Sequence, residues 1–185
     1  RQMCIRDRID NYLIKAMEEI GDRFEKQQAF VPELLMAGRA MKASLSLLQP
    51  LLKGDEATSQ LGTIVIGTVK GDLHDIGKNL VGSMFEGCGF QVVDLGVDAD
   101  SDKFVTAVKE HGANLVGLSA LLTTTMPYMK TIIEGLKAAG LRDKVKVMVG
   151  GAPVSSSFAE EIGADGYSDS ANSAVIKAKE LLGVA

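Results

Sequence analysis

The chain has 185 residues, of which 46% are hydrophobic and 24% charged, with a formal net charge of −4. A chain of this length can bury a sizeable core in one domain or two small ones. The slightly acidic charge and the lack of a basic cluster argue against nucleic acid as the main ligand. No apolar run approaches the roughly 20 residues of a bilayer span, and no signal peptide is visible. We therefore expect a cytoplasmic protein with no nucleic-acid partner and no membrane partner.

The first eight residues, RQMCIRDR, show no helical periodicity. MCIRDR is also what one reading frame of a common sequencing adapter encodes, so residues 1–8 are predicted to be a non-native leader. The chain has two cysteines, Cys4 and Cys88, which are too few for a disulfide framework and match no metal-ligand spacing. Both are predicted to be reduced and unpaired.

Residues 9–53 are predicted to be helical. Apolar residues recur at spacings of three or four in the first part of this stretch, which is typical of an amphipathic helix. Gly21 is expected to interrupt that helix, and a second helix is expected to begin at Val31 and to end before Pro50. Helices with an apolar face need a surface to cover, so we interpret the stretch as a small helical domain. A short polar segment over 54–62 is the predicted linker.

The periodicity changes after the linker, and strands alternate with helices over 63–185. The predicted strands span 63–67, 91–95, 115–118, 146–149 and 166–168. The predicted helices span 76–86, 102–111, 127–139, 156–162 and 171–182. Such alternation implies right-handed crossover connections and a parallel sheet. We therefore predict an α/β, flavodoxin-like (Rossmann-like) domain with a five-stranded parallel sheet in the order 2-1-3-4-5.

A sheet of this order binds its ligand at the carboxyl ends of the first and third strands. The loops at 68–75 and 119–125 are therefore expected to face each other across a crevice, flanked by Gly150 and Gly151. The first of these loops contains neither a dinucleotide-binding GxGxxG nor a phosphate-binding loop. No GxSxG motif is present, and the placement of the two cysteines matches no spacing of a structural zinc site. These absences argue against a dinucleotide site, a phosphate-binding loop, a hydrolase nucleophile and a structural zinc site in this crevice.

Asp72 and His74 stand two residues apart in the first loop, where an extended backbone lets both reach one site. An Asp that accepts a hydrogen bond from one ring nitrogen of His fixes its tautomer and makes the other nitrogen a better metal ligand or base. Alternatively, Asp72 or Asp75 caps the following helix and His74 is merely solvated. Spacing alone leaves these two interpretations equally open.

Three motifs taken together resemble those of the corrinoid proteins of methyltransfer systems, which are similar to the cobalamin-binding module of methionine synthase. The motifs are DxHxxG at 72–77, SxL at 119–121 and GG at 150–151, in the expected order and on the expected elements. Residues 30–50, FVPELLMAGRAMKASLSLLQP, also resemble the helical cap that precedes the fold in this family. The family's cap is a four-helix bundle, and residues 9–53 are too few to form all four helices. We therefore expect this stretch to hold a truncated helical-bundle cap.

The resemblance implies that the cofactor is cobalamin or a related corrinoid and that His74 is the axial ligand of its cobalt, in place of the cofactor's own base. Asp72 would hydrogen-bond His74 and tune its proton content. Thr125 would complete this relay at a position where methionine synthase has a Ser. The residues implied to bind the cofactor are Asp72, His74, Asp75, Ile76, Gly77, Ser119, Leu121, Thr123, Gly150 and Gly151. An apolar lid over the methyl-bearing face is expected from Phe30, Leu34, Leu35 and Met41.

The resemblance also implies a function. The chain would carry a methyl group on cobalt from a substrate-specific methyltransferase to a second methyltransferase with a folate or thiol acceptor. It would be a carrier component, not a complete enzyme, and a corrinoid-reactivating protein would be a further partner.

Three alternatives remain open at this point. The small subunit of an adenosylcobalamin-dependent mutase shares the motifs but lacks the helical cap. A cobalamin-dependent regulator or light sensor should also carry a DNA-binding segment. A plain flavodoxin-like signalling module would need neither the GG pair nor the hydroxyl-rich run after the third strand.

Overall fold

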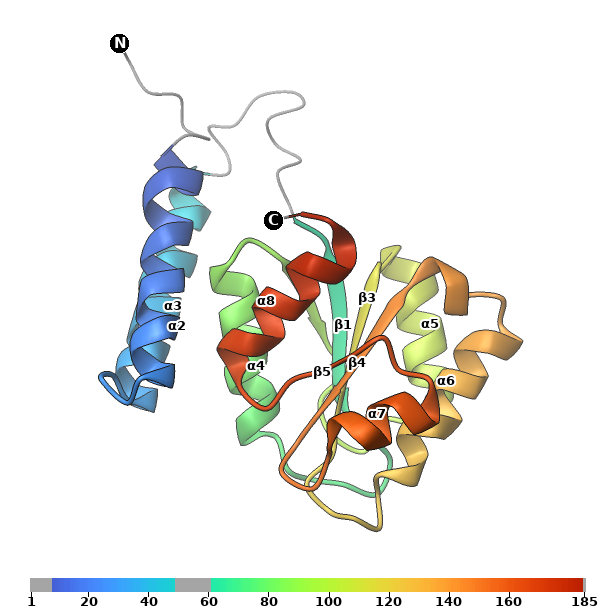
Figure 1. Ribbon diagram of the computed structural model, residues 1–185. Helices are drawn as coiled ribbons and strands as arrows, with labels where there is room; N and C mark the ends of the chain where they lie inside the picture. Colours follow the sequence, from blue (N-terminus) through green and yellow to red (C-terminus); the bar gives the residue numbers. More distant parts are fainter. Residues whose placement is uncertain (1–7, 49–60, 185) are drawn as a thin grey trace.

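The protein is built on a central parallel sheet, and the structure, a computed structural model, describes residues 8–48 and 61–184 (Figure 1). The five strands are β1 (Thr63–Thr68), β2 (Gln91–Asp94), β3 (Leu115–Ser119), β4 (Lys146–Gly150) and β5 (Gly166–Tyr167). They lie in the order β2-β1-β3-β4-β5, and all neighbouring pairs are parallel. The predicted sheet and strand order are therefore confirmed. The first and last residues of each predicted strand lie within one residue of the observed bounds.

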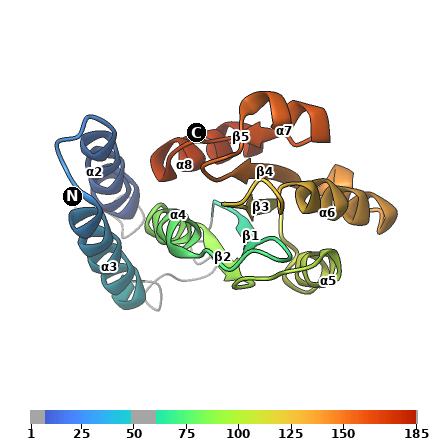
Figure 2. The same cartoon turned by 90° about the horizontal axis from the view of Figure 1, so that it is seen from below.

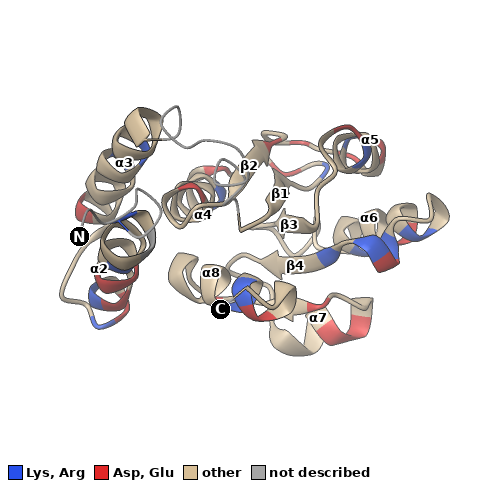
Figure 3. Cartoon of the chain, turned by 90° about the horizontal axis from the view of Figure 1, so that it is seen from above, with Lys and Arg blue, Asp and Glu red and all other residues tan. Residues whose placement is uncertain are grey.

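Helices cover both faces of the sheet, as the view from below shows (Figure 2). On one face lie α5 (Ser101–His111), α6 (Pro127–Ala138) and α7 (Ser156–Ile162), whereas α4 (Ile76–Gly87) and α8 (Ala171–Leu182) lie on the other. A single 3-10 turn, η4 (Arg142–Lys144), leads into β4. Charged residues of both signs are spread over the helices, and the strands are almost free of them (Figure 3). This distribution is what a sheet buried on both faces requires.

The N-terminal helices pack against α4 and α8, outside the sheet (Figures 1 and 2). A π-helical segment, η1 (Ile9–Ile14), continues directly into α2 (Lys15–Glu25), and α3 (Val31–Leu48) returns beside it. The predicted interruption at Gly21 is wrong, because α2 passes straight through this residue. Gly21 packs against α8, where a Cβ would lie 2.4 Å from the Asn172 Oδ1 atom. The glycine permits a close helix contact and does not end the helix.

Some predictions fall outside the described residues. These are residues 1–7 of the predicted leader, Pro50 as the end of α3, and most of the predicted linker. Cys88 is unpaired, as predicted, and the structure shows it to be buried, whereas Cys4 lies outside the described part of the chain. Burial raises the pKa of the Cys88 thiol to about 11, so this thiol stays protonated at neutral pH. None of the described helices is long and apolar enough to cross a membrane.

The register of the sheet brings three loops to one edge. Thr68 pairs with Ser119, and Ser119 pairs with Gly150, so β1, β3 and β4 end at the same level. The loops after these strands therefore leave the sheet side by side. This is the edge at which parallel α/β sheets bind their ligands.

Candidate functional site

The loop after β1 is held at the edge of the sheet by hydrogen bonds from both ends. The Val69 N–H donates to the Ser119 carbonyl at 3.0 Å, and the buried Thr68 hydroxyl donates to the His74 carbonyl at 2.9 Å. At the tip, Gly71 has a φ of +79° and its N–H donates to the Asp98 carboxylate at 2.7 Å. A side chain is strained at this φ, so glycine suits the turn. The loop is therefore fixed before any ligand binds.

Asp72 is the central acceptor of this edge and is fully buried. Its Oδ1 atom accepts from the His74 ring nitrogen Nδ1 at 2.7 Å and from the His74 N–H at 3.1 Å. Its Oδ2 atom accepts from the N–H groups of Leu121 and Leu122 at 2.8 and 3.2 Å, and from the Thr125 hydroxyl at 2.8 Å. One carboxylate thus ties the loop after β1 to the loop after β3, which confirms that the two loops face each other.

These hydrogen bonds decide the charge of Asp72. Burial by itself raises the pKa of this carboxyl group. The Leu121 N–H, the His74 ring, the Thr125 hydroxyl and the His74 N–H outweigh that effect and hold the pKa of Asp72 well below its ordinary value. Asp72 is therefore an anion across the whole neutral range.

His74 is oriented by this anion. When neutral, it donates the Nδ1 proton to Asp72, which leaves the lone pair of Nε2 available on the other side of the ring. The side chain is 52% exposed and lines the cavity described below. Metal-binding histidines commonly donate their other ring N–H to a carboxylate in this way, so the arrangement suits Nε2 as a metal ligand.

The helix-cap interpretation of this motif is wrong. Asp75 stands at the N-terminal cap of α4, but its side chain makes no capping hydrogen bond and accepts instead from the Asn79 amide at 3.1 Å. Both carboxylate oxygens of Asp72 accept hydrogen bonds from His74 and from the loop after β3. Neither Asp72 nor Asp75 therefore caps α4 with its side chain.

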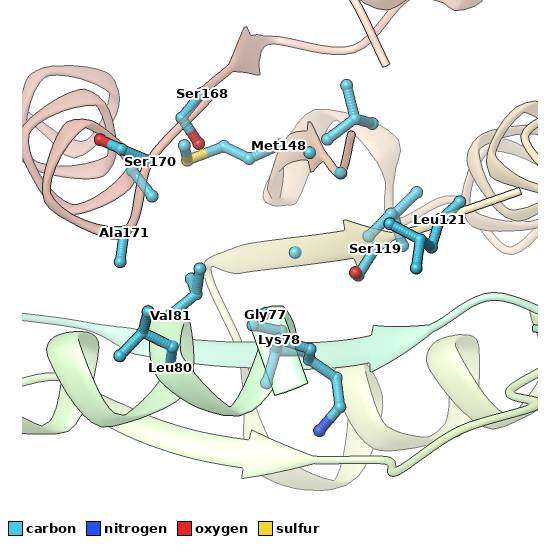
Figure 4. Close-up of a pocket in the computed structure, with 18 of the residues that line it drawn as sticks. Gly77, Lys78, Leu80, Val81, Ser119, Leu121, Met148, Ser168, Ser170 and Ala171 are labelled. Atoms are coloured by element: carbon cyan, nitrogen blue, oxygen red, sulfur yellow. The ribbon is translucent and has the colours of Figure 1, made fainter. Parts of the chain in front are cut away.

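A cavity of about 710 Å³ opens next to His74. It lies between α4 and α8, over the face of the sheet that β1, β3 and β4 present (Figure 4). Its walls are mostly apolar, with polar groups at the edge where the strands end. The labelled wall residues are Gly77, Lys78, Leu80 and Val81 of α4, Ser119 and Leu121 at and after the end of β3, Met148 of β4, and Ser168, Ser170 and Ala171 before and in α8. The space suits an elongated ligand with a large apolar surface.

Glycines shape two walls of the cavity for different reasons. Gly151 has a φ of +129°, and a Cβ there would lie 1.9 Å from the Ala120 carbonyl oxygen, so only glycine fits between the loops after β3 and β4. A Cβ on Gly77 would meet nothing within 4 Å and would project into open space. Gly151 therefore allows two loops to meet, and Gly77 keeps the first turn of α4 clear.

Lys78 is exposed over only 3% of its surface, although it belongs to the wall at the start of α4. Its amine points away from the cavity (Figure 4) and donates to the Asp94 carboxylate at 2.7 Å and to Asn79 at 2.6 Å. The pair fastens the first turn of α4 to the end of β2. Lys78 thus fixes the wall and offers no charge to a ligand.

The structure brings most of the predicted site residues together. Eight of them line the cavity, namely His74, Asp75, Ile76, Gly77, Ser119, Leu121, Gly150 and Gly151. Asp72 and the buried Thr125 lie behind His74. Thr123 is exposed and is absent from the cavity wall, so its predicted binding role finds no support in the geometry.

The predicted lid residues do not reach the cavity. Leu34 and Met41 are buried in the hydrophobic cluster that joins the N-terminal helices to α4 and α8. Leu35 is half-buried, and Phe30 is 66% exposed in the turn before α3. Leu34 and Met41 therefore act as core residues, because the apolar stripe of α3 faces its neighbouring helices.

Sequence reasoning missed one wall of the cavity. Phe24 of α2 contributes to it, as do Ser168, Asp169 and Ser170 in the loop after β5. That loop also follows the carboxyl end of a strand, so the same rule that selected the other loops could have found it. Phe24 carried no such signal, because its position depends on how α2 packs against the rest of the molecule.

Comparisons with known proteins agree with this geometry. Two family models, each described as a B12 binding domain, match residues 62–176 and residues 4–49. Dimethylamine corrinoid protein 3 of Methanosarcina mazei is 50% identical to the chain over 166 residues, which cover 90% of this chain and 99% of that protein.

Two solved structures are similar over nearly the whole chain. A cobalamin-binding protein from Desulfitobacterium hafniense has a TM-score of 0.81 at 37% identity, covering 95% of this chain and 82% of its own. The methanol:cobalamin methyltransferase complex MtaBC from Methanosarcina barkeri gives a TM-score of 0.83 at 27% identity, covering 98% and 69%.

Proposed function

The chain belongs to the B12-binding family as a corrinoid protein that carries methyl groups and works with methyltransferases, and from this premise we propose the roles of its residues. His74 is the protein ligand of the cobalt, Asp72 and Thr125 control His74, and the cavity between α4 and α8 holds the rest of the corrinoid. When bound, the corrinoid supplies a cobalt that takes up a methyl group from one partner and releases it to another. The division into a cap over 9–53, a linker and a cofactor-binding domain over 63–185 is part of the same proposal.

The observation that carries the proposal is the 2.7 Å contact between His74 Nδ1 and Asp72 Oδ1. It leaves Nε2 as the one free ring nitrogen, at the mouth of a cavity that can take a large ligand. Among the described residues, no group of three or more His, Cys, Asp or Glu could hold a bare metal ion. A single imidazole donor suits a metal whose other ligands come from a macrocycle.

Asp72 and Thr125 keep a negative charge beside the His74 ring. Because His74 is half exposed, its Nε2 can take up a proton from solvent whenever this nitrogen is free, and Asp72 is then the counter-charge. Thr125 Oγ1 lies 2.8 Å from Asp72 Oδ2 and 2.9 Å from the Leu122 carbonyl, yet it has only one hydrogen. It can donate to only one of these acceptors at a time, and the anionic Asp72 is the stronger acceptor. Thr125 therefore stabilises Asp72 as the anionic partner of His74.

The names of the relatives support a proposal for the methyl source. Several similar proteins are named as dimethylamine or trimethylamine corrinoid proteins, at 46–50% identity. We therefore propose a methylamine as the methyl source, presented by a substrate-specific methyltransferase. A second methyltransferase with a folate or thiol acceptor, a corrinoid-reactivating protein and a cytoplasmic location complete the proposal.

The mutase alternative fits less well. That subunit lacks a helical cap, whereas this chain has the helical hairpin of α2 and α3, and a B12-binding family model covers it. The hairpin therefore favours the methyl carrier.

The test uses the two histidines of the chain as a matched pair. His111 is exposed at the end of α5, on the opposite face of the sheet from the cavity. Wild type, His74→Ala and His111→Ala are each loaded with hydroxocobalamin, and their absorption spectra are compared. Wild type and His111→Ala are expected to share one spectrum, and His74→Ala to give another.

Two outcomes would overturn parts of the proposal. If the wild-type protein binds no corrinoid, the proposed function is wrong. If the spectrum of His74→Ala is identical to that of the wild type, His74 is not the ligand, but corrinoid binding still stands.

A further inference from the structure

The cavity has one wall that does not belong to the α/β layers. Phe24 of α2 lines the cavity together with Ala171 and Ala174 of α8. Phe24 also lines a second, more open hollow of about 650 Å³ beside the turn between α2 and α3. Asp169 and Ser170 border both spaces as well. Phe24 thus stands in the partition between the cavity and a hollow that opens to solvent.

The contact between α2 and α8 keeps this partition in place. In its middle, Gly21 meets Asn172 so closely that a Cβ would lie 2.4 Å from the Asn172 Oδ1 atom. Asn172 is itself buried at 4% exposure, in the first turn of α8. The fit depends on the missing side chain of Gly21, so the two helices can approach only while this position is glycine.

Two polar contacts flank Gly21 on either side. Glu18 Oε1 accepts from the Lys179 amine at 2.7 Å, and the Lys179 side chain is only 15% exposed. At the other end, the Ser170 hydroxyl donates to Glu25 Oε1 at 3.1 Å, next to the cavity wall. The first contact joins α2 to α8, and the second joins the end of α2 to Ser170, the N-terminal cap of α8. Such contacts contribute modestly to stability, and the ion pair between Glu18 and Lys179 weakens with salt.

We propose that α2 is the retaining wall of the corrinoid cavity, that Phe24 closes it, and that the contacts of Glu18, Gly21 and Glu25 with α8 and its N-cap set how fast bound corrinoid escapes. This inference rests on the proposed function. It adds a cofactor-retaining role for α2 that is separate from metal ligation, since none of these side chains contacts His74 or Asp72 among the hydrogen bonds of the site.

The test measures the release rate of hydroxocobalamin after dilution of the loaded protein into an excess of an apo-protein trap. Phe24→Ala is expected to release the corrinoid about tenfold faster, because the cavity gains a second exit and loses an aromatic contact. Phe24→Tyr keeps the ring and is expected to release it at the wild-type rate. The absorption spectrum of every variant should match that of the wild type, since His74 is untouched.

A neighbouring pair of glutamates provides the matched control. Glu18 pairs with Lys179 across the contact, whereas Glu19 pairs only with Arg23 on α2 itself. Glu18→Ala is expected to speed release about two- to fivefold at low salt, and Glu19→Ala not at all. Adding salt should speed release from the wild type and leave Glu18→Ala nearly unchanged.

The outcomes separate this inference from the proposed function. If the wild type binds corrinoid through His74 but Phe24→Ala and Glu18→Ala release it at the wild-type rate, α2 is not the retaining wall. Equal acceleration by Glu18→Ala and Glu19→Ala also overturns it, because the effect would then come from the helix and not from the contact. If Phe24→Ala fails to fold, the Glu18 and Glu19 variants decide alone.

Discussion

Gly67 and Gly117 lie on opposite faces of the sheet and have different surroundings. On the α5–α6 face, the Phe104 ring fills the space beside Gly67 of β1, since a Cβ on this glycine would lie 2.8 Å from the ring. The helices of this face also touch, because a Cβ on Gly135 of α6 would lie 1.9 Å from the Ser101 hydroxyl of α5. On the α4–α8 face, Gly117 of β3 lines the cavity. One face is closed by packing, and the other keeps space for a ligand.

This difference separates stability from binding. Substitutions on the α5–α6 face should lower the free energy of unfolding and leave corrinoid binding intact in the folded protein. Substitutions in the cavity wall should weaken corrinoid binding and lower the free energy of unfolding by a smaller amount. The predictions below test this separation, from the largest expected effect to the smallest.

Phe104→Ala is expected to lower the free energy of unfolding by about 3–5 kcal/mol, because the fully buried ring fills the space above Gly67. Urea unfolding measures this loss. Met148→Ala at the cavity should cost less, since its side chain already borders open space. An equal loss for the two variants would contradict the difference between the faces.

Asp72→Asn is expected to lower the free energy of unfolding at pH 7 by about 1.5–3 kcal/mol, because an amide cannot accept all the hydrogen bonds that the carboxylate accepts. The folded-state pKa of Asp72 is lowered, so its contribution is present above the unfolded-state value and lost as the pH falls towards the folded-state value. The gap between wild type and variant should therefore narrow below about pH 4. Urea titrations at several pH values check this, and a gap independent of pH would refute it.

Gly67→Ala and Gly117→Ala compare the two faces at one type of substitution. Gly67→Ala should destabilise by about 1–3 kcal/mol through its clash with Phe104, without changing corrinoid affinity. Gly117→Ala has more room, at 3.3 Å from the nearest Ile66 atom, and should cost about 1 kcal/mol or less while it weakens corrinoid binding. Urea denaturation gives the free energy of unfolding of each variant, and equilibrium titration with hydroxocobalamin gives its corrinoid affinity. Weaker binding by Gly67→Ala alone would reverse the assignment of the faces.

Thr125→Val should cost about 1 kcal/mol, because it removes a buried hydroxyl that bonds to Asp72, whereas Thr125→Ser keeps it. Valine should also shift the pH at which the spectrum of the loaded protein changes, and serine should not. A pH titration of the absorption spectrum detects the shift. The relay role of Thr125 fails if valine and serine behave alike.

Much of this fold was predictable from local patterns. The β-branched runs around Ile64 and Val116 predict buried strands, and the strand order then brings Asp72 close to Thr125, which lies 53 residues further along the chain. The site was predictable because its residues belong to three short motifs that follow the carboxyl ends of strands. The structure contributed the hydrogen bonds that reject the helix-cap alternative.

The rest depends on packing between distant elements. A glycine in a helical sequence marks either the end of the helix or a close contact with another helix. Only the position of Asn172 shows that Gly21 makes a close contact. The apolar stripe of α3 could serve a lid or a core, and the position of α4 assigns Leu34 to the core. Phe24 reaches the cavity for the same reason. In each case the decisive neighbour lies on another element, outside the reach of local periodicity.

The central claim is that the free Nε2 of His74 binds the cobalt. Protein labelled with ¹⁵N-histidine, loaded with unlabelled hydroxocobalamin and reduced to the cobalt(II) state, tests it by electron paramagnetic resonance. A nitrogen axial ligand splits the cobalt signal into triplets for ¹⁴N and doublets for ¹⁵N. We predict doublets in labelled wild type and in labelled His111→Ala, and their loss in His74→Ala. Triplets that persist in the labelled wild type would show that the nitrogen comes from the cofactor itself and would contradict the account.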